Sequence, residues 1–328
     1  MNNVTPERII EVANGFVAAK YLFVANDVGL FESLADGPAT LEELTQRTGV
    51  PRRTLRILTD AVTALGFLER QDHRYQNSPV AATFLSGRTP GDLRPFLRFW
   101  DRLGYPTWMR LEEAIRTDQT TFEGFTEEQQ QLYSDGVEAI TSGTAQALAT
   151  AYDFSQHRRV LDLGGGTGSF LVAVLNRYSG LEGTLYELPP VAEIARQRLS
   201  SSPLAERIKV VEADFFKDPV PGGHDAFILA NILHCFSPER DLELLRGIRR
   251  QVDGGARLLL VDFWTDPTHT EPAFAALMAG EFLLIPGGGD VYSAEEARVW
   301  LQESGWRTVE HKALAGPASV IVAEVVES

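Results

Sequence analysis

The chain has little cysteine, little positive charge and no long apolar run, and each shortage excludes a class of protein. Its single cysteine, Cys235, cannot form a disulfide within the chain, which favours a cytoplasmic setting. Its 30 Lys and Arg residues face 45 Asp and Glu, a net charge of −15, which argues against broad contact with nucleic acid. The N-terminal stretch carries Glu7, Arg8 and Glu11 where a signal peptide needs an apolar core, and no run of about 18 apolar residues occurs. We therefore predict a cytoplasmic protein without nucleic-acid or membrane partners.

The composition that is present is that of an ordinary globular protein. The chain is 44% hydrophobic and 23% charged, so it can bury a large core and is not disordered. Its 328 residues suggest about two domains at ~150 residues each. The patterning changes near residue 90 and again near residue 157, which divides the chain into segments 1–90, 91–157 and 158–328.

Segment 1–90 predicts a winged-helix module. TLEELTQRTGV and PRRTLRILTDAVTALG have helical periodicity, Gly66 ends the second helix, and FLERQDHRYQNSP predicts a hairpin. Such a module can bind DNA through Arg52, Arg53 and Arg56, or it can simply pack and support dimerisation. From the first of these helices to the end of the hairpin there are six Arg and five acids, so phosphate contact has thin support and we favour the packing role.

Segment 91–157 is predicted to be helical and unusually aromatic. Aromatic side chains at helical spacing more often form core than line a ligand pocket, and we expect at least half of these to be core. The rest could line a flat apolar pocket. The aromatic residues in question are Phe96, Phe99, Trp100, Tyr105, Trp108, Phe122, Phe125 and Tyr133.

Segment 158–328 alternates short apolar runs with helical stretches. RRVLDLGGGTG, GTLYELP, RIKVVEADFF, DAFILANILHCF and ARLLLVDFW are the apolar runs, and their near-continuous apolar character predicts parallel strands covered on both faces. The last two apolar segments, WRTVEHKAL and ASVIVAEVVE, are joined only by AGP. That connection is too short for a crossover, so the sheet should end in an antiparallel hairpin.

The motif DLGGGTG, residues 162–168, follows the first of these strands and precedes a helix. Glycines there permit tight turns and close ligand approach, and the free N–H groups of a helix start attract an anionic group. The dinucleotide fingerprint would need Gly or Ala three residues after Gly166, where Ser169 stands, and no phosphate-loop Gly-Lys-Ser/Thr follows. Nicotinamide and nucleoside triphosphate ligands are therefore disfavoured.

Acidic and aromatic residues follow the next two strands. Glu187 ends the second strand, where an acid can accept hydrogen bonds from both hydroxyls of a ribose. Asp214 and Phe215 end the third, suited to the amino group and the face of an adenine. Ligands bind at the carboxyl ends of the strands of an open α/β sheet. The glycine loop and these residues together therefore predict a nucleoside site.

His234 and Asp262 are predicted to end the fourth and fifth strands. At neighbouring strand ends the carboxylate could orient the imidazole and stabilise its charged form. Cys235 beside His234 raises the possibility of a metal, but neighbouring strand residues point to opposite faces and no other Cys/His cluster exists, so we expect no metal site.

These features together resemble the S-adenosylmethionine-dependent small-molecule O-methyltransferases, the group containing the caffeic acid and acetylserotonin methyltransferases and many bacterial natural-product tailoring enzymes. The resemblance covers nearly the whole chain, from the winged-helix start through WMRLEEAI, DLGGGTG, YELPPV, ADFF and NILHCF to GGGDVYSAEEARVWLQESGW. It implies an α/β fold with a Rossmann-like, seven-stranded, mostly parallel sheet ending in an antiparallel hairpin. It also implies that 1–90 is a dimerisation domain of a homodimer, 91–157 a linker and substrate-pocket segment, and 158–328 the catalytic domain.

The resemblance assigns roles to particular residues. The glycine loop would hold the methionine end of S-adenosylmethionine, Glu187 the ribose, and Asp214 with Phe215 the adenine. His234 matches the family's general base, and Asp262 and Asp290 match the two acids, commonly Glu, that flank it. The residues so assigned to the cofactor are Gly164, Gly165, Gly166, Glu187, Asp214, Phe215 and Asn231.

The chain departs from the family pattern at three places near the base. The family often has His-Asp-Trp where His234, Cys235 and Phe236 stand, a Lys where Asn231 stands, and Glu-Arg-Thr in the segment that starts at Asp290. These departures leave open C-methylation, or a non-methylating reaction that uses the cofactor as a structural cation. A DNA-binding, ligand-sensing regulator is a third, less favoured hypothesis.

The acidity of the acceptor narrows the reaction. Holding acceptor and methyl group in near-attack geometry is worth ~7 to 11 kcal/mol in favourable cases. A phenol with a pKa of ~10 lies ~3.5 units above an unperturbed His, a mismatch of about 5 kcal/mol, whereas an aliphatic alcohol would be mismatched by about 12 kcal/mol. We therefore predict a phenol, enol or carboxylic acid as the acceptor, with His234 as the base.

Overall fold

The computed structural model describes residues 4–252 and 254–326, and the chain divides into two compact units. The first unit runs to Tyr105 and also includes Asp135–Ala139, and the second comprises the remainder. Segment 91–157, which the sequence analysis treats as one region, is therefore shared between the two units.

The first unit has the predicted winged-helix arrangement. Its small sheet has the strand order β1-β3-β2 with antiparallel pairing. A capping box between Thr40 and Glu43 starts α3, and Gly66, at φ +79°, follows the end of α4. Asp72 and His73 both have positive φ, as a tight hairpin turn between β2 and β3 requires. The elements are α1 Glu7–Asp27, α2 Leu30–Ser33, β1 Ala39–Thr40, α3 Leu41–Thr48, α4 Arg52–Ala64, β2 Leu68–Gln71, β3 Arg74–Asn77, α5 Pro79–Phe84, α6 Arg94–Phe99 and a π-helical turn at Trp100–Gly104.

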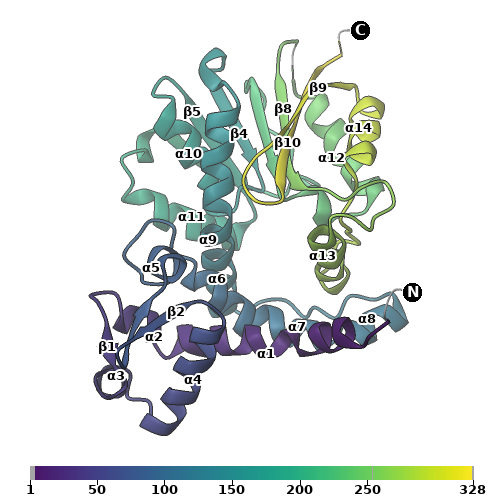
Figure 1. Ribbon diagram of the computed structural model, residues 1–328. Helices are drawn as coiled ribbons and strands as arrows, with labels where there is room; N and C mark the ends of the chain where they lie inside the picture. The colour runs from purple at the N-terminus through teal and green to yellow at the C-terminus, as the bar shows by residue number, and fades with distance from the viewer. Residues whose placement is uncertain (1–3, 253, 327–328) are drawn as a thin grey trace. The chain divides into compact units, whose positions relative to one another are not determined.

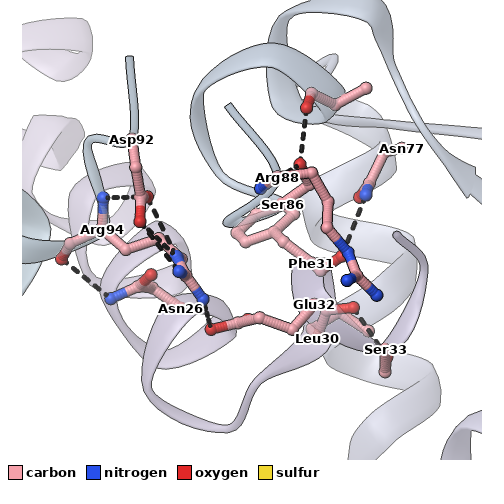
Figure 2. A network of polar contacts seen from close by, with 11 residues as sticks. Asn26, Leu30, Phe31, Glu32, Ser33, Asn77, Ser86, Arg88, Asp92 and Arg94 are labelled. Atoms are coloured by element: carbon pink, nitrogen blue, oxygen red, sulfur yellow. Dashed lines mark hydrogen bonds and ion pairs between the residues drawn. The ribbon is translucent and has the colours of Figure 1, made fainter. Parts of the chain in front are cut away.

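A polar network ties the helices of this unit together, as Figure 2 shows. The Arg94 guanidinium donates to both oxygens of Asp92 and to Glu32, and the Arg94 carbonyl accepts from Asn26 at 3.4 Å. Burial alone would raise the pKa of Asp92, but the bonds from Arg94 lower it. The start of α6 is thereby fastened to α1 and α2.

Helix α1 exposes an apolar surface. Of the described helices, it alone is long and apolar enough to cross a membrane, judged by length and composition. Its exposed apolar side chains are Ile9, Ile10, Val12, Phe16, Val17 and Val24.

The second unit is built on a seven-stranded sheet with the order β6-β5-β4-β7-β8-β10-β9 (Figure 1). The five strands from β6 to β8 are parallel, and β10 pairs antiparallel with both β8 and β9. The predicted terminal hairpin is thus confirmed, with β10 inserted next to the parallel strands. The strands are β4 Arg159–Leu163, β5 Glu182–Glu187, β6 Ile208–Glu212, β7 Ala226–Ala230, β8 Arg257–Phe263, β9 Trp306–Ala313 and β10 Ala318–Val325.

Helices cover both faces of this sheet. Helices α12 and α14 bury their apolar residues in one core cluster, and α10, α11 and the end of α9 bury theirs in another. Strand β8 alternates between the two, since Leu258 and Leu260 belong to the first cluster and Leu259 and Val261 to the second. The remaining described α-helices of the chain, whether or not they cover the sheet, are α7 Tyr105–Trp108, α8 Leu111–Thr117, α9 Glu127–Ala151, α10 Ser169–Arg177, α11 Pro189–Ser200, α12 Pro238–Arg249, α13 Ala273–Leu284 and α14 Ala294–Glu303. The boundary between the units falls within α7 and within α9.

Candidate active site

The glycine loop after β4 forms a close-fitting cradle. Gly164 and Gly166 have φ of +66° and +59°, which side-chain-bearing residues rarely adopt. A Cβ on Gly164 would overlap Ile232, and one on Gly165 would overlap the carboxyl group of Asp162. The loop therefore needs glycine both for its backbone angles and for the space around it.

Glu187 is held against this loop by two backbone groups. As the last residue of β5, it accepts hydrogen bonds from Gly166 N at 2.9 Å and from Leu188 N at 2.7 Å. Burial raises the pKa of Glu187, while these two bonds oppose that change. The acid is thus oriented at the carboxyl edge of the sheet, beside the glycines.

Asp162 is a buried acid that the sequence analysis did not assign. Neither of its carboxyl oxygens has a hydrogen-bond partner among the described residues. Burial, with a smaller contribution from the charge of Glu187, raises the pKa of Asp162 to about 8, and the backbone N–H of Leu171, which lies nearby, opposes this change. Its place at the start of DLGGGTG was the available signal, because a buried strand rarely contains an unpaired carboxylate.

Asp214 and Phe215 lie just beyond β6, in a turn rather than at the strand end. The carboxylate of Asp214 accepts from Phe216 N at 2.9 Å and pairs with Lys217 at 2.8 Å, so its pKa is lowered chiefly by Lys217. The ring of Phe215 packs edge-on against Phe216 and Phe236. Ala213 N donates to Glu187 O, which brings this turn beside the end of β5.

Together these groups fit S-adenosylmethionine. The cofactor carries an ammonium and a sulfonium, and unpaired carboxyl oxygens such as those of Asp162 suit a cationic ligand. Glu187 can accept from ribose hydroxyls, and the glycine cradle admits a ligand close to the backbone. Asn231, at φ +57°, lies one residue past β7, and its backbone N donates to Val261 O.

His234 and Asp262 form a buried pair. The two atoms His234 Nδ1 and Asp262 Oδ1 are 2.7 Å apart, and the same oxygen accepts from Phe263 N at 2.9 Å. Since Asp262 holds Nδ1, the nitrogen left to take a proton is Nε2. The imidazole stacks on Phe282 with ring centres 4.0 Å apart, so its plane is set by packing as well as by the hydrogen bond.

The surroundings of His234 favour its charged form. Burial lowers its pKa, but the charge of Asp262, the neighbouring Cys235 and the bond to Asp262 outweigh that and raise the pKa of His234 to about 10. This pKa lies well above that of an unperturbed histidine, from which the sequence analysis calculated the mismatch with a phenol.

The local structure around His234 differs from the predicted strand end. Strand β7 stops at Ala230, and His234 lies in the 3-10 turn Leu233–Cys235. The argument that strand geometry points Cys235 away from His234 was therefore wrong, and the Cys235 thiol lies close enough to raise the pKa of His234. Among the described residues no group of three His, Cys, Asp or Glu side chains could hold a metal ion.

Asp290 lies in the glycine-rich segment that packs on this turn. Ser237 N donates to Gly287 O at 3.1 Å, and a Cβ on Gly289 would overlap the His234 carbonyl oxygen. The carboxylate of Asp290 accepts from Val291 N at 2.7 Å. No hydrogen bond joins it to His234 among the residues that the structure describes, so of the two flanking acids only Asp262 touches the imidazole.

Aromatic side chains lie around the His234 ring and along α13. Phe263 packs against His234, Phe282 and Phe274. Just before Phe282 on α13, Glu281 accepts a hydrogen bond from Trp108 Nε1, and Gly280 leaves room for the indole. Burial raises the pKa of Glu281, and the bond from Trp108 opposes this change. The predicted aromatic residues divide, since Phe96, Phe99 and Trp100 pack with one another in the first unit.

Comparison with known proteins places these features in one family. Residues 113–307 match the O-methyltransferase domain and residues 10–87 the O-methyltransferase dimerisation domain. The chain is 34% identical to 3-hydroxy-5-methyl-1-naphthoate 3-O-methyltransferase of Streptomyces sahachiroi, covering 98% of this chain and 95% of that protein. It is 29% identical to the tetracenomycin polyketide synthesis 8-O-methyl transferase TcmO of Streptomyces glaucescens, covering 97% and 96%.

Solved structures agree with this result. The structure of PigF with SAH has a TM-score of 0.86 and 29% identity, covering 98% of this chain and 100% of that one. Human N-acetylserotonin methyltransferase in complex with SAM has a TM-score of 0.90 at 24% identity over 99% of both chains, a likeness of fold.

Proposed function

Because this chain belongs to the O-methyltransferase family, as an S-adenosylmethionine-dependent enzyme, we propose that it methylates a hydroxyl group of a small aromatic natural product, with His234 as the general base. The observation that carries the proposal is the buried His234–Asp262 pair at the carboxyl edge of the sheet. Relatives named for a naphthoate and a tetracenomycin methyltransferase support an aromatic acceptor.

The cofactor would be held by the glycine loop, Asp162, Glu187, and the Asp214–Phe215 turn. When bound, it supplies an electrophilic methyl group on a sulfonium and a positive charge that disfavours protonation of a nearby imidazole. Methyl transfer is an in-line displacement, so the main contribution of the protein is to hold the acceptor oxygen in line with that group.

In its neutral form, which the positive charge of the bound cofactor would favour, His234 would take the acceptor's proton at Nε2. A phenol has a pKa of ~10, and the surroundings raise the pKa of His234 to about 10, so proton transfer between them is nearly balanced. An aliphatic alcohol at ~16 remains mismatched by roughly 8 kcal/mol. The preference for a phenol, enol or acid follows from this difference.

Replacement of His234 tests the base. We expect His234→Ala to lower turnover by about 10² to 10⁴-fold and to leave the affinity for S-adenosylhomocysteine in calorimetry nearly unchanged. Mass spectrometry of a panel of phenols, enols and acids would identify the acceptor, and NMR of the product separates O- from C-methylation. Unchanged turnover in His234→Ala would remove the base from the proposal.

The regulator hypothesis loses its support in the first unit. Arg52 pairs with Glu42 and Arg56 with Asp60, so two of the three guanidinium groups predicted to contact phosphates already face carboxylates. A salt-dependent mobility shift on duplex DNA would be needed to revive it.

We also propose a cytoplasmic homodimer in which α1 contributes to the interface. The chain carries the dimerisation domain of the family, and α1 exposes apolar side chains such as Ile9 and Phe16 that burial against a second copy would remove from water. Light scattering should give twice the mass of 36.2 kDa, and Phe16→Glu should lower it.

A further inference from the structure

Asp241 is a fully buried acid on the inner face of α12. The residues of α12 that face the core are Asp241, Leu244, Leu245 and Ile248, spaced as one side of a helix. The apolar members pack into a single core cluster. Asp241 is therefore the one acid in an otherwise apolar row, and neither of its carboxyl oxygens has a hydrogen-bond partner among the described residues.

This row faces a matching row on β8. Leu258, Leu260 and Trp264 belong to the same core cluster as α12. By the alternation of a strand, Asp262 points to that same face. Asp262 is thus the acid in the row of core-facing residues on β8, just as Asp241 is the acid in the row of core-facing residues on α12.

The two acids lie at the same end of their elements. The chain leaves β7 at Ala230, forms the His234 turn, and starts α12 at Pro238. The first turns of α12 therefore lie at the carboxyl edge of the sheet, where Asp262 stands near the end of β8. Asp241 is buried in the first turn of α12, the helix that follows the turn carrying His234.

The electrostatic neighbours of Asp241 agree with this placement. Burial and the charge of Asp262 raise its pKa to about 9, and His234 opposes the change. Asp241 also influences Tyr292, whose hydroxyl donates to Phe236 O at 2.5 Å and whose pKa is raised by burial and by Asp241.

Two further groups complete these surroundings. Cys235 contributes to raising the pKa of His234, and the charge of Asp290 contributes to raising the pKa of Tyr292. His234 is the cationic neighbour of Asp241 among the groups that act on it.

We propose that Asp241 is a positioning residue for the His234–Asp262 pair: an enclosed second carboxyl that stays protonated in the working range and, when it ionises, makes His234 hold its proton more tightly. The proposal rests on the proposed role of His234 as base. Asp241 neither gives nor receives the acceptor's proton, and it does not touch substrate.

The physical argument is one of charge. While Asp241 is protonated, Asp262 is the carboxylate that stabilises the imidazolium, and His234 releases its proton more readily than it would beside two carboxylates. A second carboxylate in the same enclosure would stabilise the imidazolium, because an opposite charge favours the charged form of a base. Packing alone gives no reason for an acid here, since an unpaired buried carboxyl is costly where the neighbouring positions hold Leu.

The test is the titration of the His234 imidazole, followed by NMR of ¹⁵N-histidine in the full-length protein and assigned with His234→Asn. Asp241→Asn keeps the size of the side chain, and Asp241→Ala removes it. We expect the midpoint of His234 to fall in both variants, by on the order of one pH unit. A midpoint unchanged in both, or shifted in opposite directions, would overturn the proposal.

A second measurement detects the proton on Asp241 itself. At neutral pH, infrared difference spectra of wild type minus Asp241→Asn should contain the carbonyl band of a protonated carboxylic acid, which disappears in alkaline solution. A carboxylate band instead would contradict the proposal. Neither readout requires turnover, so a failure of His234 as base, seen as unchanged turnover in His234→Ala, is distinguishable from a failure of the coupling.

Discussion

An ion pair of the first unit and an ion pair of the second differ in how far their side chains are exposed to water. In the first unit Arg52 and Glu42 form an ion pair in which both side chains are about two-thirds exposed, and the side chains of Arg74 and Glu43 are 45% and 41% exposed. In the second unit His234 and Asp262 are 6% and 2% exposed. The first arrangement leaves charges in water, and the second encloses them.

This difference separates charges that water solvates from charges that the proposed mechanism uses. Exposed pairs contribute about 0 to 1 kcal/mol, because water already solvates both partners. Enclosed charges cost several kcal/mol unless they are paired, and breaking such a pair costs about 3 to 5 kcal/mol. Buried acids at the carboxyl edge of the sheet therefore point to function, whereas the more numerous exposed Arg residues of the first unit do not.

The largest effect that would test this contrast is expected from Asp262→Asn. Removing the carboxylate leaves the imidazolium unpaired in a buried site, so turnover should fall by roughly 10² to 10³-fold, or about 3 to 4 kcal/mol. Because Asp262 helps to raise the pKa of His234, the midpoint of the pH–rate profile should shift to lower pH.

Asp225→Asn is the matched control. Asp225 accepts hydrogen bonds from the backbone N–H groups of Arg158 and Arg159, at the start of β4 and so at the opposite end of the strands. It should leave the midpoint in place. An equal shift in both variants would show that net charge, rather than the pair, sets the profile.

The next effect concerns the stability of the folded protein. Asp241 has a pKa raised from 3.8 to about 9, so at pH 7 folding requires it to bind a proton, at a cost of up to roughly 4 kcal/mol. An acid whose folded pKa is raised loses stability as the pH climbs from the unfolded to the folded value. Asp241→Asn should therefore raise the free energy of unfolding at pH 7 and lose this advantage below about pH 4.

Urea denaturation at both pH values measures this change, with the exposed Glu239→Gln on the same helix as the control. A variant destabilised at pH 7 and at pH 4 alike would mean that the Asp241 carboxyl has a structural partner.

A smaller effect is expected at Glu187. The amide of Glu187→Gln can accept from Gly166 N, but its NH₂ group would then face the N–H of Leu188, which now donates to the other oxygen. We expect the affinity for S-adenosylhomocysteine to fall by about 1 to 3 kcal/mol, measured by calorimetry. Glu193→Gln, an exposed acid on α11, should bind as wild type does.

The smallest effect is expected in the first unit. Arg52→Ala should change the free energy of unfolding by less than about 1 kcal/mol and should leave the affinity for duplex DNA undetectable at low salt. A loss of measurable DNA binding in this variant would break the contrast between the two units.

Several site features could be predicted because they depend on local pattern. The strand ends at Glu187 and Asp262 follow from apolar runs bounded by an acid, and both lie where predicted. The positions of His234 and Asp214 do not follow from this pattern, because β7 stops four residues before His234 and β6 two residues before Asp214. The apolar run ILHCF has the composition of a strand. In the structure it forms a turn, and Ser237 just after it donates its backbone N–H to Gly287 O in the glycine-rich segment.

The buried acids show where pattern ceases to be informative. Asp241 sits among exposed charges in PERDLELL, and only the packing of α12 on the sheet encloses it. Asp162 belongs to a glycine-rich motif whose pattern predicts a tight loop and does not by itself show that its acid is buried.

Residue order and composition were enough to establish an alternating α/β domain with a final hairpin, a winged-helix start and a family of enzymes, because these depend on periodicity and short motifs. Only the tertiary packing decided that Nδ1 of His234 is hydrogen-bonded, that Asp262 is its partner, and that Asp241 is buried nearby. Such relations join residues distant in the chain, and their energies depend on exclusion from water, a property that a linear pattern does not carry.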